Sequence, residues 1–280
     1  MLIHRSRSPR KGLLVASLLA LVSLAVAASA QATTLPTLTL TLTSSTITVG
    51  GSPQSGAVNV ITSGTGLKEA SAILFQMKPG VTDAEVEAVL KNPVKDPNTT
   101  SKYGSIVFDV EVPAHGSYEA QTYLQPGQYF ALEPGEKKGA KAFTFFTVTA
   151  AASPVALPTP EATVRSIDFA FRGPKVLHDG ELVRFENEGF VVHMDFAFPV
   201  KSKKDAKQAE KDLIDGKEKA IEKLIVGEPV AFAGPLSHEA FQQETITAKP
   251  GWYVQVCFME TQDGRDHTLL GMERILRIVK

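Results

Sequence analysis

Four side chains in the second half of the sequence have the types and the order of a ligand set for one soft metal ion. Cys257 is the only cysteine, His267 follows it by ten residues, Met272 follows five residues later, and His193 comes earlier in the chain. A thiolate and two imidazoles suit copper in a trigonal plane, and a thioether supplies a weak axial contact that helps to set the redox potential. We therefore predict His193, Cys257, His267 and Met272 as metal ligands.

The elements that must position these ligands read mainly as β-strands. Residues 167–171 and 181–185 alternate apolar with polar or small side chains at period two, and residues 37–49 do so with threonines. Glycine-containing turns such as Asp179-Gly180 separate the runs. This pattern predicts small antiparallel sandwiches.

Each half of the chain also contains one predicted helix. The first covers residues 83–90, and the second covers residues 203–226, where small and aliphatic side chains recur at steps of three and four among many charges. Gly216 is a candidate break in the second helix. The two halves place their strands, helix and Pro-Gly landmarks in the same order, which indicates an internal duplication.

A proline-rich stretch near the middle predicts the boundary between the halves. We assign residues 31–150 to a first domain, residues 151–161 to a semi-rigid linker and residues 162–280 to a second domain. The first domain contains no cysteine and no suitably placed histidine, so we expect it to bind no metal of this type.

The first thirty residues predict a secretory signal peptide. A basic start precedes an apolar run over residues 13–27 and a small-residue cleavage site at residues 28–30. Residues 1–30 hold four of the 29 basic residues and none of the 30 acidic ones, so their removal leaves a net charge of −5. A mildly acidic chain gives no electrostatic case for nucleic acid. We expect a secreted or periplasmic protein with no stable membrane insertion after cleavage.

The second domain resembles the cupredoxin family of blue copper proteins. The resemblance is carried by the order His193, Cys257, His267 and Met272, by the strand over residues 250–257 and by the loop that follows it. It implies an all-β fold of two tandem Greek-key cupredoxin-like β-sandwiches, each with a short helical insertion, of which the first is a degenerate repeat. It also implies one type 1 copper site, electron transfer and a redox partner protein. Three departures are Met194, where many members have asparagine, a long polar loop over residues 258–266, and the helical insertion between His193 and Cys257.

Two other functions stay open at this point. A free cysteine is often a small buried apolar side chain, and Met272 or His193 alone fits an ordinary core. The chain would then be a metal-free extracellular binding or scaffold sandwich, although a metal would mask an otherwise unpaired thiol in an exported protein. Copper storage or delivery is the other alternative. We expect no enzyme, because the sequence shows no serine nucleophile motif, carboxylate pair or phosphate loop, and no further histidine pairs for a multicopper oxidase.

Overall fold

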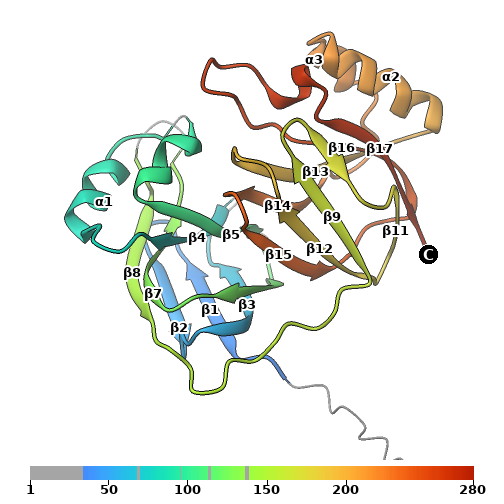
Figure 1. Cartoon of the computed structure of the whole chain (residues 1–280). Helices are drawn as coiled ribbons and strands as arrows, with labels where there is room; N and C mark the ends of the chain where they lie inside the picture. The colour runs from blue at the N-terminus through green and yellow to red at the C-terminus, as the bar shows by residue number, and fades with distance from the viewer. Residues whose placement is uncertain (1–33, 68–69, 95, 113–114, 136–138) are drawn as a thin grey trace, which may run out of the picture. The chain divides into compact units, whose positions relative to one another are not determined.

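The computed structural model describes residues 34–67, 70–94, 96–112, 115–135 and 139–280 (Figure 1). The predicted signal peptide lies outside these residues. Residues 34–280 form one compact unit. No helix in the described part of the chain is long and apolar enough to cross a membrane.

The described residues of the first half form eight strands in two groups. One group has the order β2-β1-β3-β6, and the other is a sheet with the order β5-β4-β7-β8. The strands are β1 (Thr37–Leu42), β2 (Ile47–Gly51), β3 (Gly56–Gly64), β4 (Ala70–Met77), β5 (Gly104–Val112), β6 (Ser117–Leu124), β7 (Gly127–Glu133) and β8 (Ala142–Val148). Within the first group β1 runs parallel to β3, and the other neighbours are antiparallel.

The second half repeats this arrangement with nine strands. One group has the order β10-β9-β12-β15, and the other is a sheet with the order β14-β13-β16-β17-β11. The strands are β9 (Ala162–Ile167), β10 (Ala170–Arg172), β11 (Val176–His178), β12 (Leu182–Asn187), β13 (His193–Val200), β14 (Val230–Leu236), β15 (Phe241–Thr245), β16 (Gly251–Val256) and β17 (Glu273–Val279).

The two halves therefore share their strand order, except that β11 has no counterpart in the first half, and this common order confirms the internal duplication. In each half the first strand is parallel to its partner, β1 to β3 and β9 to β12. The groups β2-β1-β3-β6 and β10-β9-β12-β15 join through the pairing of Gln121 on β6 with Gln243 on β15, giving one eight-stranded sheet. The predicted all-β fold of two tandem Greek-key sandwiches is confirmed, and the exact domain boundaries stay a prediction.

Buried apolar side chains fill the space between the two sheets of each half. In the second half Val164, Val183 and Phe185 of one sheet share a core with Tyr253 and Leu276 of the other. Such a core requires the period-two alternation that the sequence shows, because successive side chains of a strand point to opposite faces. This core also contains Cys257 and Met272.

The predicted helix over residues 83–90 is confirmed. The second predicted helix is confirmed with its break, but it ends at Ile221 rather than at residue 226, because Ile225 makes a β-bridge with Val200. Helix α1 (Asp83–Leu90) begins with a capping box in which Thr82 and Glu85 bond each other's backbone. Helix α2 (Lys203–Ile214) ends before Gly216, whose φ of +66° suits glycine, and α3 (Glu218–Ile221) follows. The apolar face of α2 covers the outer face of β13 and β16.

Two strand predictions were wrong, and both missed a reversal. Residues 37–49 form the hairpin of β1 and β2, because residues 43–46 make a turn closed by Thr43 and Thr46. Residues 167–171 bend between β9 and β10, where Phe169 has a φ of +60°. Period-two alternation continues through a short hairpin turn, so the pattern alone could not show these reversals.

Candidate metal centre

His193 is the first residue of β13 and is placed by an irregular stretch of that strand. The pairing of β13 with β14 shifts register between His193 and Asp195 and again between Asp195 and Phe196. Bulges of this kind redirect side chains and are common next to functional sites. His193 is 1% exposed, so its imidazole lies inside the sandwich.

The other three predicted ligands lie between β16 and β17. Cys257 directly follows β16, His267 begins the 3₁₀ turn η2 (His267–Leu270), and Met272 directly precedes β17. Gly271 has a φ of +91° and allows the chain to turn from η2 into β17. The backbone of Met272 accepts a hydrogen bond from Cys257 N–H and donates one to the His267 carbonyl. These bonds hold the three residues in one short, closed segment.

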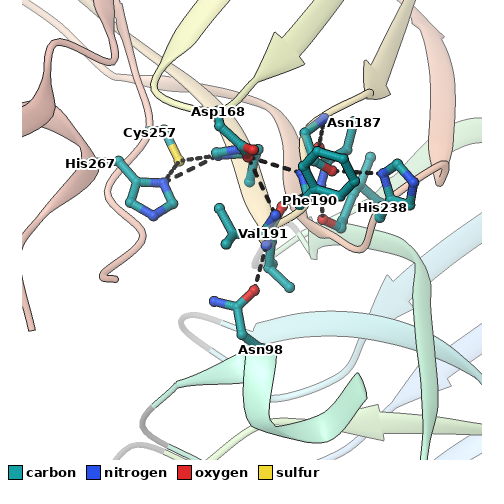
Figure 2. A network of polar contacts seen from close by, with 12 residues as sticks. Asn98, Asp168, Asn187, Phe190, Val191, His238, Cys257 and His267 are labelled. Atoms are coloured by element: carbon teal, nitrogen blue, oxygen red, sulfur yellow. Dashed lines mark hydrogen bonds and ion pairs between the residues drawn. The ribbon is translucent and has the colours of Figure 1, made fainter. Parts of the chain in front are cut away.

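The structure brings two imidazoles and the thiol into one buried triangle. The Nδ1 atoms of His193 and His267 are 3.2 Å apart, and Cys257 Sγ lies 3.4 Å from His267 Nδ1 and 3.8 Å from His193 Nδ1. Cys257 and His267 are 0% exposed. Figure 2 shows Cys257 and His267 directed toward each other. Three donor atoms from three separated points of the sequence therefore face one small volume.

The spacing and the chemistry of this triangle fit a copper ion. First-row metals lie about 2.0 Å from imidazole nitrogen and about 2.3 Å from thiolate sulfur, so neighbouring donors of a trigonal site stand about 3.5 Å apart. The observed separations cluster around that value. Two imidazoles with a thiolate are the trigonal set of a type 1 copper site.

The two histidines are in the protonation state that metal binding needs, whereas Cys257 must lose a proton. Burial lowers the pKa of His193, against the opposing effect of Asp168, and burial with repulsion from His193 lowers the pKa of His267 to about 4. Both imidazoles are therefore neutral near pH 7. Burial raises the pKa of the Cys257 thiol to about 12, so a metal must displace its proton.

Met272 is placed beside this triangle by its backbone and is completely buried. It is 0% exposed and belongs to the same apolar cluster as Cys257. Met194 occupies the position at which many cupredoxins have an asparagine. Its backbone N–H donates a hydrogen bond to Cys257 Sγ at 3.4 Å. A main-chain donor thus contacts the sulfur at this position.

Asp168 supports the site and was not predicted from the sequence. Its Oδ1 lies 3.2 Å from His193 Nε2 and also accepts hydrogen bonds from the N–H groups of Phe190 and Val191 (Figure 2). An acceptor at Nε2 keeps the proton there and leaves the Nδ1 lone pair directed toward the triangle. Asp168 lies in the turn between β9 and β10 that the period-two pattern concealed, so no sequence signal identified it.

We expect Asp168→Ala to weaken copper binding by about ten- to a hundredfold, because the carboxylate that fixes the tautomer and orientation of His193 is lost. The measurement is a competition titration with a copper chelator. Asp263→Ala, which removes an exposed carboxylate from the polar loop, is the matched control and should leave the affinity unchanged. Equal affinities for the Asp168 variant and the unaltered protein would contradict this role.

Two asparagines hold the segment that leads into His193. Asn187 Nδ2 donates to the carbonyls of Val191 and Leu236, and its Oδ1 accepts from Gly189 N–H. Asn98, from the first half of the chain, accepts a hydrogen bond from Val192 N–H at 2.7 Å (Figure 2). The first half therefore contacts the residue next to a predicted ligand. The sequence also did not predict the contact between Phe169 and His267, whose ring centroids are 5.0 Å apart.

Comparison with known proteins gives structural likenesses and no sequence matches. No family model matches the chain, and no curated protein matches it. A reduced auracyanin from Roseiflexus castenholzii is 18% identical, with 42% of this chain and 95% of that chain covered and a TM-score of 0.26. A copper-containing nitrite reductase from Thermus scotoductus is 14% identical, with 88% and 68% covered and a TM-score of 0.26. A copper nitrite reductase from Nitrosomonas europaea is 11% identical, with 87% and 94% covered and a TM-score of 0.23.

At TM-scores this low, the structural likenesses are not evidence for the fold or the site. The evidence is the strand order of the sheets and the buried cluster of donor atoms. The chain has a cupredoxin-like fold in two repeats, and the second repeat has a buried His-Cys-His cluster, with Met272 next to it in the chain, that fits a type 1 copper site.

Proposed function

We propose that the protein binds one copper ion through His193, Cys257, His267 and Met272 and transfers single electrons. The observation that carries the proposal is the buried triangle of two Nδ1 atoms and one Sγ atom. Copper bound there would supply one-electron redox chemistry. Cys257 would be the anionic ligand, and the two histidines and Met272 would be neutral ligands.

The chain's own contribution is to hold the donors in place and to exclude water. All four side chains are at most 1% exposed. Asp168 fixes the proton of His193 on Nε2, and Met194 N–H stabilises negative charge on Cys257 Sγ. Donors held by a packed core keep their positions when the charge of the bound ion changes, which favours rapid electron transfer.

Exposed apolar side chains next to the ligands support a partner-binding role. Phe258 follows Cys257 directly and is 45% exposed, Leu269 lies in η2 with His267 and is 39% exposed, and Phe190 is 83% exposed. Apolar side chains exposed close to a redox centre suit contact with another protein. The proposed partner is a redox protein outside the cytoplasm, in keeping with the predicted signal peptide. That the protein is not itself an enzyme stays a prediction.

The test of copper binding is equilibrium dialysis followed by metal analysis. We expect one copper per chain in the unaltered protein and in His238→Ala, because His238 lies outside the cluster and its Nδ1 contacts the carbonyl of Gly189. His267→Ala should no longer retain this copper ion, since one of the three donor atoms of the triangle is removed. Equal copper content in the His267 and His238 variants would contradict the proposal and favour the metal-free scaffold.

A further inference from the structure

An apolar pocket lined by the first half of the chain and by Pro235 of β14 shares no residue with the proposed copper site. The pocket has a volume of about 290 Å³ and lies between α1 and the sheet that contains β4, β5 and β7. Phe75 and Phe130, whose rings stack with centroids 4.8 Å apart, form part of one wall. Val86 and Leu90 of α1 form part of the opposite wall.

The size and the walls of this pocket favour a compact aromatic occupant. An apolar cavity of 150 Å³ is large enough for benzene, so a pocket about twice that size suits two fused rings. Ordered water is disfavoured over most of the pocket, because a stable water needs two to four polar partners and most of the lining side chains are apolar. Aromatic rings also prefer offset-stacked or edge-to-face contacts with other rings, which Phe75 and Phe130 provide.

A buried carboxyl group interrupts the apolar lining. Asp109 on β5 lines the pocket and is only 3% exposed, and the hydroxyl of Ser71 donates to its Oδ1 at 2.5 Å. An ionised carboxylate has about four acceptor sites on its two oxygens. Asp109 therefore keeps acceptor capacity for a ligand. The lining also holds the hydroxyls of Ser71, Thr100 and Tyr103, of which Ser71 donates to Asp109 and Thr100 to the Pro97 carbonyl. A buried carboxylate acceptor in a mainly apolar pocket selects a molecule with a hydrogen-bond donor.

The exposed residues of the pocket lining include Val94, in the segment that follows α1, and Pro134. Val94 lines the pocket and is 39% exposed, whereas Asp109 is buried. A ligand would thus enter past Val94 and reach Asp109 with its polar end. A ligand with a carboxylate or phosphate would be repelled by Asp109, and a sugar would find too few polar partners.

We propose that this pocket binds a small aromatic alcohol, of the size of a two-ring phenol, with its rings between α1 and the phenylalanines and its hydroxyl donating to Asp109. The site is independent of the proposed copper function, and it gives the repeat without predicted metal ligands a binding role of its own.

The test is isothermal titration of the metal-free protein at pH 8 with 2-naphthol and with 2-methoxynaphthalene, which has the same rings and no donor. Burial raises the pKa of Asp109 to about 7, so the acceptor is mostly ionised at pH 8. We expect one equivalent of 2-naphthol to bind, with an affinity at least tenfold above that of the methoxy compound.

Two variants locate the binding. Val89→Trp fills the pocket from the half-buried side of α1, and Val94→Trp blocks the exposed entrance, so that a result is obtained even if one variant fails to fold. Each folded variant should reduce 2-naphthol affinity at least tenfold. Val226→Trp, at an exposed position of the second half, is the control and should bind normally. No saturable binding, equal affinities for the two compounds, or undiminished binding by the folded pocket variants would overturn the proposal.

Discussion

Replacing Cys257 with serine is expected to abolish the strong visible absorption of the copper-loaded protein. That absorption arises from charge transfer between a thiolate and Cu(II), and Cys257 is the only cysteine in the sequence. Serine has a similar size and a buried hydroxyl that Met194 N–H can still contact, so the fold should survive. Its oxygen is a harder donor that suits copper less well in this trigonal set. The measurement is a visible spectrum after addition of one equivalent of Cu(II).

Met259→Leu is the matched control for this substitution. Met259 is buried near the site, and its carbonyl accepts a hydrogen bond from His267 N–H, but it is not a predicted ligand. A leucine keeps the backbone bond and the apolar volume, so the band should persist. An unchanged spectrum for Cys257→Ser would mean that copper binds elsewhere.

Replacing Arg274 with methionine is expected to destabilise the metal-free protein by roughly 3–5 kcal/mol. Arg274, on β17, is 5% exposed, and its Nε donates to Gln255 Oε1 at 2.6 Å. Gln255 Nε2 in turn donates to both oxygens of the buried Asp195 carboxylate. Burial raises the pKa of Asp195 to about 7, against the opposing effects of Gln255 and Arg274. At a pH above about 7, where the carboxylate is mostly ionised, removing the cation leaves it buried without its charge partner.

Urea unfolding of the metal-free protein measures this cost, with two comparisons. Arg277, on the same strand, stacks on the ring of Trp252. Arg277→Met removes this contact and should lower the free energy of unfolding by only about 0.5–1 kcal/mol. The double variant Asp195→Asn with Arg274→Met removes both charges and should recover much of the lost stability. A single variant Arg274→Met as stable as the unaltered protein would contradict a structural role for this network.

The sequence predicted the parts of the fold that depend on local patterns. Alternation identified β12, the capped and periodic segments identified α1 and α2, and Gly216 marked the end of α2. The common order of elements identified the repeat, which the strand orders of the sheets confirm. The ordered set of soft donors predicted three residues that the fold brings into one triangle, and Met272 is buried beside them in the same core cluster.

The rest depends on contacts between distant segments, for which a single sequence has no signal. Asp168 lies 25 residues before His193 in a turn whose alternation resembles a continuous strand. Asn98 reaches Val192 from the other half of the chain, 94 residues away. The backbone pairing of β6 with β15 joins Gln121 to Gln243, and polar residues in a strand do not indicate which strand they will meet.

The central claim is that one copper ion lies inside the triangle of His193, Cys257 and His267. The most direct test is a crystal structure of copper-soaked protein with an anomalous difference map at the copper absorption edge. The account predicts one strong peak about 2 Å from each Nδ1 atom and slightly farther from Cys257 Sγ. Peaks only at exposed histidines such as His178 or His238, with none in the triangle, would contradict it.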